Sequence, residues 1–189
     1  MKRHLAAAWL VSASLLAAPA LAADPSIAVV NVQKVMGESS AVKGVREQLE
    51  SKYKSFQADI NKKKEPLQKE GQELVKKKSV LAKDAYGEKA KELDKKMTEV
   101  QQEAEQKKAM LNNASARSSE EIQKAVSGIV NDIAKEKGYV LVVSTETPTS
   151  QVLYADSKID ISSEVVKRLN DKLPKIDVKF EAPAKAEKK

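Results

Sequence analysis

The chain has 189 residues and a formal net charge of +7, because 34 Lys and Arg outnumber 27 Asp and Glu. It contains no cysteine, which excludes disulfides, thiolate nucleophiles and cysteine-based zinc sites. Its one histidine, His4, lies in a segment that we expect to be removed, so imidazole-based acid–base catalysis is excluded from the processed chain.

Residues 1–22 have the three parts of a cleavable export signal. A basic start that ends at His4 precedes a largely apolar run of 14 residues, 5–18, and Ala20 and Ala22 occupy the −3 and −1 positions of a cleavage site. A membrane span needs about 20 apolar residues, so this run is too short for one, and a buried core helix is the alternative. We expect an exported, soluble protein of 167 residues (189 − 22), with charge +5 after the loss of Lys2 and Arg3.

Three segments rich in β-branched residues are predicted to be strands: residues 27–33, 139–144 and 151–155. Ser162 or Ser163 is predicted to cap a short helix after them, with an apolar stripe formed by Val165, Val166, Leu169 and Leu173. Residues 23–38 and 138–173 therefore form one small α+β body in this prediction. The Lys-, Ala- and Pro-rich residues 174–189 are predicted to be a disordered basic tail.

Residues 39–137 have helix composition and a seven-residue apolar period, typical of a coiled coil. The reversal is expected near residues 79–87, with Asp84 as the cap of the return helix and Gly138 as its end. We therefore predict an antiparallel hairpin that projects as an arm; a single straight helix in a parallel coiled coil is the alternative. The outgoing heptad positions are Tyr53, Ile60, Leu67, Leu74 and Leu81, with a second series at Val42, Leu49 and Phe56.

Three short strands and one helix make a body at the lower limit of independent stability. Residues 140–143 are apolar on both faces, as in a sheet that is covered on both sides, and one helix covers only one. We therefore predict an oligomer built through the strands; the alternative is that the long helices fold back over the sheet. The residues expected at the contact between chains are Ile27, Val29, Val30, Val32, Val140, Leu141, Val142, Val143, Val152 and Leu153.

The excess positive charge lies on the outgoing helix. Residues 43–83 contain 12 basic and 6 acidic residues, a net of +6, and the charge is concentrated at Lys62–Lys63–Lys64 and Lys76–Lys77–Lys78. These runs are either solvated helix faces or a surface for acidic polymers, anionic lipid head groups or negatively charged polypeptides. Nucleic acid is not expected as a partner, since aromatic stacking platforms are missing. No catalytic motif or cofactor-binding loop is present, so the sequence predicts neither enzymatic activity nor a cofactor.

The chain resembles the Skp (OmpH) family of periplasmic chaperones. The resemblance rests on the order and spacing of five stretches, at residues 27–36, 45–53, 139–143, 152–156 and 159–166. It implies a homotrimer in which three strands per chain form a small central β-barrel, with three helical arms around a cavity. It further implies that the chain holds unfolded outer-membrane proteins in the periplasm, without ATP, for delivery to outer-membrane assembly. The tail after Leu173 departs from the family pattern, and lipopolysaccharide-binding residues have no match here.

A holdase requires weak contacts at many points, which a cationic wall and scattered apolar side chains provide. A periplasmic coiled-coil adaptor and an envelope protein that binds lipopolysaccharide are the alternative functions. The predicted client-binding residues are the two lysine clusters, Lys62, Lys63, Lys64, Lys76, Lys77 and Lys78, together with Val80, Leu81 and Tyr86 near the arm tip.

Overall fold

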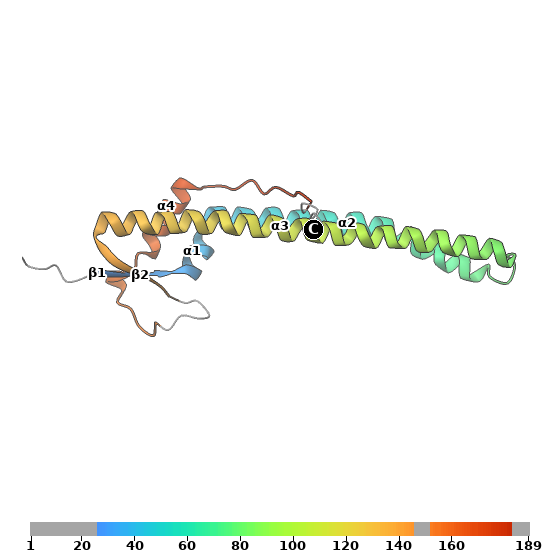
Figure 1. The fold of residues 1–189 in the computed structure, drawn as a ribbon, viewed down its shortest axis with the longest axis horizontal. Helices are drawn as coiled ribbons and strands as arrows, with labels where there is room; N and C mark the ends of the chain where they lie inside the picture. Colours follow the sequence, from blue (N-terminus) through green and yellow to red (C-terminus); the bar gives the residue numbers. More distant parts are fainter. Residues whose placement is uncertain (1–25, 146–151, 183–189) are drawn as a thin grey trace, which may run out of the picture.

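The computed structural model describes residues 26–145 and 152–182, which form a small body at one end of a long helical hairpin (Figure 1). The expected signal peptide, residues 1–22, and the end of the expected tail, residues 183–189, lie outside the described residues. In chain order the elements are β1 (Ser26–Asn31), α1 (Val32–Glu38), α2 (Ser40–Lys76), α3 (Lys83–Lys137), β2 (Tyr139–Thr145), the 3-10 turn η1 (Ser157–Ile159) and α4 (Ser162–Lys172).

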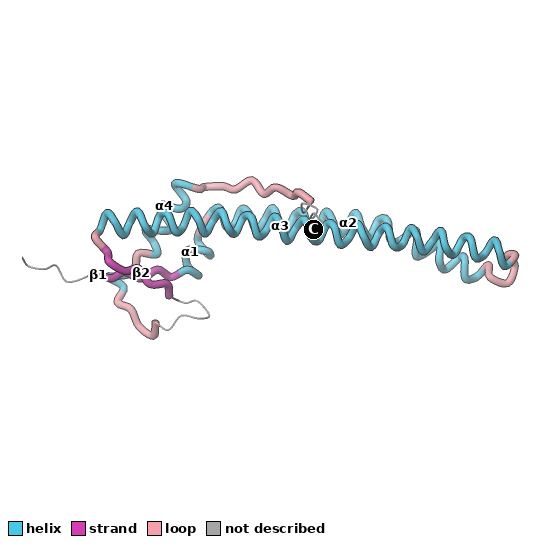
Figure 2. Tube along the Cα trace, in the orientation of Figure 1, coloured by secondary structure: helices cyan, strands magenta, loops and turns pink. Residues whose placement is uncertain are grey.

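The body contains a parallel pair of strands, β1 and β2. The hairpin carries the chain out and back, so that Tyr139 at the start of β2 lies opposite Ser26 at the start of β1. The other edge of β1 receives the segment before α4, because the backbone N–H of Ile161 donates to the carbonyl of Val29 at 2.9 Å. Figure 2 shows both strands at the same end of the hairpin as α1 and α4.

The predicted third strand, residues 151–155, is wrong for the single chain. Residues 152–155 have no strand structure, and Gln151 lies outside the described residues. Both edges of β1 are occupied, and within the described residues no strand pairs with the outer edge of β2. Residues 152–155 therefore lie outside the sheet, and Leu153 is completely exposed.

The first strand ends earlier than predicted, and it is followed by a short helix, α1, that its composition does not indicate. Val32 and Gln33, expected in the strand, belong to α1. The side chain of Asn31 accepts a hydrogen bond from the backbone N–H of Lys34 at 2.8 Å, which caps the new helix. This cap ends the strand although β-branched residues continue beyond it.

The antiparallel hairpin is confirmed: α2 and α3 pack along their length, and the chain turns at residues 77–82. Gly138 ends α3 in the left-handed conformation, with φ 72°, as its position predicts. Asp84 does not cap α3, because that helix already begins at Lys83, after an N-cap at Ala82 that has no side-chain hydrogen bond. Asp84 instead lies in the first turn of α3, where its negative charge interacts favourably with the positive end of the helix dipole.

The predicted heptad positions of the outgoing helix are buried or half-buried except for Tyr53, which is 53% exposed, and most of the seam is only half-buried. In α2 the buried residues are Ala41, Val45 and Leu74, and in α3 they are Ala114, Ser118, Ile122, Ile129 and Ile133. Lys107, which interrupts the pattern, lies inside the seam with a side chain only 16% exposed. The outer arm is therefore held by a thin apolar contact.

The main core lies where the base of α3 meets the sheet and α4. The alternative in which a long helix covers the sheet is thus partly realised, since Ile129 and Ile133 of α3 pack on Ala28 and Val30 of β1. The predicted apolar stripe of α4 contributes to the same core. The other members of the cluster are Val35, Ile161, Val165, Val166 and Leu169.

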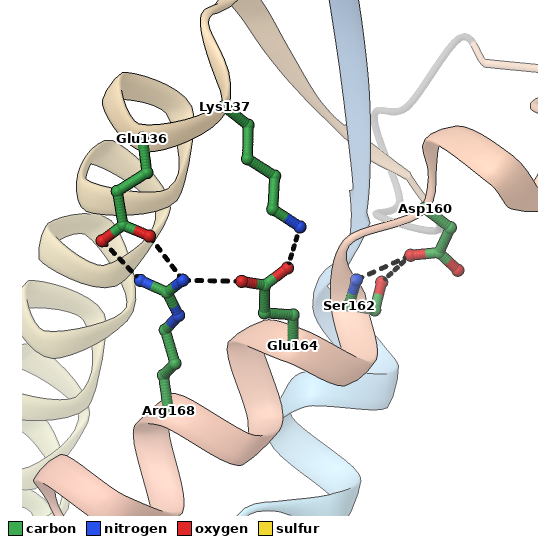
Figure 3. Close-up of polar contacts among 6 residues, drawn as sticks. All are labelled: Glu136, Lys137, Asp160, Ser162, Glu164 and Arg168. Atoms are coloured by element: carbon green, nitrogen blue, oxygen red, sulfur yellow. Dashed lines mark hydrogen bonds and ion pairs between the residues drawn. The ribbon is translucent and has the colours of Figure 1, made fainter.

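The start of α4 is fixed by polar contacts that differ from the predicted cap. Neither Ser162 nor Ser163 is the N-cap, which is Ile161; instead the Asp160 carboxylate accepts from the Ser162 backbone N–H at 2.8 Å and from its hydroxyl. Next to this turn, Arg168 and Lys137 join the carboxylates of Glu136 and Glu164, which ties α4 to the end of α3 (Figure 3).

The predicted disorder of the tail is wrong for the part that the structure describes. Residues 174–182, here named the tail segment, run extended beside the basal half of the hairpin (Figure 1). Ile176 is 5% exposed and belongs to a second apolar cluster with Ala41, Val45 and Ile122. The Lys-rich composition suggested disorder, but Ile176, Val178 and Phe180 alternate with charged residues and are buried or half-buried on the side that faces the arm.

Candidate functional site

An open apolar groove lies along the basal half of the hairpin, between α2 and α3. It encloses about 820 Å³ and is here named the basal groove. Its wall on α2 combines both predicted heptad series, whereas α3 offers mostly small or polar side chains such as Ser115 and Asn112. Because α3 does not cover the larger side chains of α2, they stay partly exposed. The apolar residues that line the groove are Met36, Val42, Val45, Leu49, Tyr53, Phe56, Ile60, Ala104, Leu111 and Ile122.

A cation lies at the outer half of this groove. The Lys107 ammonium is 4.5 Å from the centre of the Phe56 ring and 2.9 Å from a carboxylate oxygen of Asp59. The hydrogen bond from Lys107 lowers the pKa of Asp59, so this carboxylate stays ionised and neutralises part of the charge. The groove therefore combines an apolar wall with a fixed positive charge over an aromatic ring.

A second lysine connects the groove to the tail segment. The Lys52 ammonium lies 4.9 Å from the centre of the Phe56 ring and 5.5 Å from the centre of the Phe180 ring. Val45 and Ile122 also belong both to the groove and to the cluster around Ile176. The tail segment and the basal groove are therefore neighbouring parts of one surface.

The structure separates the two predicted lysine clusters. Lys62, Lys63 and Lys64 follow directly after Ile60 and Asn61, which line the groove, so this cluster lies at its outer end. All three lysines are exposed, and Lys63 pairs with Glu103 of α3. This hydrogen bond from Lys63 is the main reason that the pKa of Glu103 is lowered.

The second cluster lies at the tip. Lys76 ends α2 and pairs with Glu73 at 2.9 Å, and the Lys78 ammonium is 6.0 Å from the centre of the Tyr86 ring. Val80 is 79% exposed in the turn, whereas Leu81 and Tyr86 are half-buried. The tip thus brings together the six other predicted client-binding residues, with Lys77 among them. At 1.5 Å per residue, Lys76 lies about 21 Å along α2 from Lys62 in the first cluster. Whether these residues bind clients stays a prediction.

The residues predicted to join chains include buried, half-buried and exposed side chains in the single chain. Val29 and Val30 are buried within the single chain, and Val32 is half-buried in α1. The exposed members are Ile27 at 43%, Val140 at 68%, Leu141 at 51% and Leu153 at 100%; Val142, Val143 and Val152 are half-buried. An apolar parallel strand with one uncovered edge is unusual for a stable monomer. A contact between chains at this edge stays a prediction.

The basal groove is not visible as a site in the sequence. Its α2 residues were recognised, but as a seam for a partner helix. The groove forms because α3 places Lys107 and small side chains opposite Phe56 and Leu49, which the spacing of α2 alone does not reveal. Within the described residues, no helix is long and apolar enough to cross a membrane, and no group of three or more Asp or Glu is arranged to hold a metal ion.

Comparison with known proteins gives one family and one fold. The model of the family described as outer membrane protein (OmpH-like) matches residues 26–169. A solved structure from Caulobacter crescentus CB15, described as a candidate outer membrane chaperone (OmpH-like), is similar, with a TM-score of 0.74. The alignment is 18% identical and covers 83% of this chain and 90% of that one, so it supports the fold. A comparison with curated proteins gives no match.

Proposed function

The chain belongs to the OmpH-like family, and from this membership we propose that it is an ATP-independent holdase chaperone of the periplasm. It binds unfolded outer-membrane proteins between its helical arms and keeps them soluble until they are delivered to outer-membrane assembly. The proposal requires no catalytic chemistry and no cofactor. The chaperone description of the Caulobacter crescentus protein, which has the same fold, supports it.

The observation that carries this proposal is the basal groove. A holdase must bind segments of many sequences without fixing one conformation. An open apolar wall with half-exposed Leu49, Phe56 and Ile60 offers such binding, since burial of apolar surface is non-directional. The groove is long and shallow, which suits an extended chain better than a compact small molecule.

The lysine clusters add attraction at longer range. Lys62 and Lys64 form no ion pair among the described residues, so their charge is available at the outer end of the groove. Such charges steer a partner toward the arm, and salt weakens the effect. Anionic lipid or lipopolysaccharide at the tip cluster would use the same charges.

Association of three chains through the β2 edge completes the proposed architecture. Val140 and Leu141 would be covered in a shared barrel, and residues 152–155 would gain a strand partner in a neighbouring chain. The exposure of these residues in the single chain supports this arrangement. Three arms would then enclose one cavity, with each basal groove near its floor.

The test is the aggregation of an outer-membrane protein that is diluted from urea into buffer with the processed chain. The proposal predicts that the client stays soluble. The double variant Leu49→Asp/Ile60→Asp should lose most of this protection, because two charges interrupt the apolar wall. Ala116→Asp, which adds a charge at an exposed position of α3 outside the groove, is the matched control and should protect normally. An adaptor or a lipopolysaccharide-binding protein would leave the client to precipitate, and that result would refute the proposal.

A further inference from the structure

The tail segment has the contact pattern of a β-strand although it belongs to no sheet. Ile176, Val178 and Phe180 are buried or half-buried against the arm, whereas the residues between them are exposed. Alternation of this kind means that one side of an extended chain faces the hairpin. Residues 174–182 therefore occupy a surface that receives an extended peptide (Figure 2).

The arm holds the backbone of this segment through two side chains of α2. The Ser40 hydroxyl donates to the carbonyl of Pro174 at 3.1 Å, and Gln48 binds the middle of the segment. The Gln48 amide nitrogen donates to the carbonyl of Ile176 at 2.7 Å, and its amide oxygen accepts from the N–H of Val178 at 3.0 Å. The amide thus takes the place that a peptide group of a neighbouring strand has in a sheet. These bonds recognise extended backbone whatever its side chains are, as in strand addition to a sheet edge.

Side-chain contacts select for the alternating pattern. Ile176 fills a site between Ala41, Val45 and Ile122, and Val178 packs at its edge. The aromatic ring of Phe180 lies beside the Lys52 ammonium. The surface therefore accepts apolar side chains at positions i and i+2 and an aromatic ring at i+4, with polar residues between them.

We propose that this surface of α2 and α3 is a binding site for extended client segments with alternating apolar and polar residues, and that the tail segment occupies it as an internal substitute for a client. The identity of the client rests on the proposed function. Strands of outer-membrane barrels alternate in this way and carry aromatic residues near their ends. The tail segment imitates one such strand and leaves when a client strand takes its place.

The contacts of the tail segment permit such an exchange. Only Ile176 is buried, and the three backbone hydrogen bonds come from two side chains, Ser40 and Gln48. Glu181 is held by Arg117 in an exposed ion pair of little strength. Because the segment is tethered, its effective concentration is on the order of millimolar, so it competes with single strands. A client with many strands overcomes this competition by binding several arms at once.

Two measurements on the processed chain test the proposal. The first is hydrogen exchange at the Val178 amide, which Gln48 protects in the free protein. The probe is a synthetic peptide with the sequence of residues 174–182, and the control peptide has the same composition with its three apolar residues placed together. The alternating peptide should remove the protection of Val178, and the control peptide should leave it in place.

The second measurement is the affinity of a fluorescent form of the alternating peptide. Ile176→Asp should release the tail and strengthen peptide binding by about tenfold or more. Asp177→Ser, at an outward-facing position 83% exposed, is the matched control and should leave the affinity unchanged. Gln48→Ala should weaken binding of the peptide in the released variant, and because alanine favours helices the arm should stay folded.

These outcomes separate this inference from the proposed function. If saturating unfolded outer-membrane protein is kept soluble while the Val178 amide stays protected, the tail is a fixed brace and the inference fails, although the holdase function stands. If the peptide replaces the tail but the client precipitates, the binding site stands and the holdase function fails. An unchanged or weaker peptide affinity in Ile176→Asp overturns the inference.

Discussion

The guanidinium of Arg168 on α4 donates two parallel hydrogen bonds to the carboxylate of Glu136 on α3, at 2.8 and 2.6 Å. The same guanidinium binds Glu164 at 2.7 Å, one turn away on its own helix. Bidentate contacts of this kind fix geometry as well as charge. Arg168 therefore fixes the orientation of α4 against the end of the arm, next to the sheet.

This cluster predicts a dependence of stability on acid pH. The hydrogen bonds from Arg168 lower the pKa of Glu136, and those from Lys137 and Arg168 lower the pKa of Glu164, both from 4.5. A carboxylate whose pKa is lower in the folded chain contributes its full stabilisation above its unfolded pKa, here 4.5, and loses it as the pH falls from there through the folded pKa. The urea midpoint should thus decrease below about pH 4.5, and less steeply in Arg168→Met.

The control for this prediction is Lys124→Met. Lys124 pairs with Glu120 within one helix and also lowers the pKa of that carboxylate, but it joins no two elements. Its removal should change the acid dependence less than the removal of Arg168. Equal pH profiles for Arg168→Met and the unmodified chain would show that the cluster does not stabilise the fold.

Two glycines should respond to alanine with opposite signs. Gly138 has φ 72°, where a side chain costs about 1–2 kcal/mol, so Gly138→Ala should destabilise the chain. Gly128 lies inside α3 with nothing within 4 Å of an added Cβ, so Gly128→Ala should stabilise it by about 0.5–1 kcal/mol. Urea denaturation of both variants measures the change in the free energy of unfolding. A Gly138→Ala variant that is more stable than the unmodified chain would contradict the left-handed C-cap at Gly138.

The core at the base of α3 should dominate stability. Ile133 is 0% exposed between the sheet and α4, so Ile133→Ala should lower the free energy of unfolding by about 2–5 kcal/mol. Val80→Ala removes an exposed apolar side chain at the tip and should change it by less than about 0.5 kcal/mol. Similar losses at both positions would mean that the core is misplaced.

The β2 edge should control assembly. Leu141→Lys places a charge at a position that is 51% exposed in the single chain. It should leave the fold of one chain intact and dissociate the proposed oligomer. Val80→Lys is the control, because it also replaces an exposed apolar side chain by lysine, but at the tip of the arm. Sedimentation velocity distinguishes them, and an unchanged sedimentation coefficient for Leu141→Lys would place the contact between chains elsewhere.

The lysine clusters should govern the salt dependence of client binding. Replacing Lys62–Lys64 and Lys76–Lys78 by glutamine should weaken binding of an unfolded outer-membrane protein and flatten its dependence on salt, since screened attraction is removed. Titrations at low and high ionic strength measure both effects. Unchanged affinity at low salt would remove these residues from the client site. The control replaces six exposed lysines elsewhere, Lys43, Lys89, Lys91, Lys95, Lys135 and Lys167.

The sequence alone predicted the elements that depend on local patterns. The seven-residue period from Val42 onward gave the hairpin, and Gly138 marked the end of α3 because few other residues adopt its conformation. The stripe from Val165 to Leu169 gave the buried face of α4. Each of these signals lies within a few turns of the chain.

Features that depend on distant partners were missed. Asn31 ends β1 by capping a helix, which β-branched composition does not indicate, and residues 152–155 form no strand in the part of the chain that the structure describes. The alternation of Ile176, Val178 and Phe180 was visible in the sequence. Its meaning depended on Gln48, 128 residues from Ile176, and the many lysines pointed to disorder instead.

The candidate site was predicted only in part. The lysine clusters were identified from charge, but the basal groove required knowledge of which α3 side chains lie opposite α2. Lys107 illustrates this point, because it lies on α3 and the structure places its ammonium over the Phe56 ring of α2. The charge of a segment follows directly from its sequence. Which side chains of one helix are covered by side chains of another does not.

The most direct test of the account is the mass of the soluble species that forms when an unfolded outer-membrane protein is diluted from urea into the processed chain. Size-exclusion chromatography with light scattering gives this mass. The account predicts one complex in which three copies of the chain hold one client. A folded monomer that elutes alone, with the client in the pellet, would contradict it.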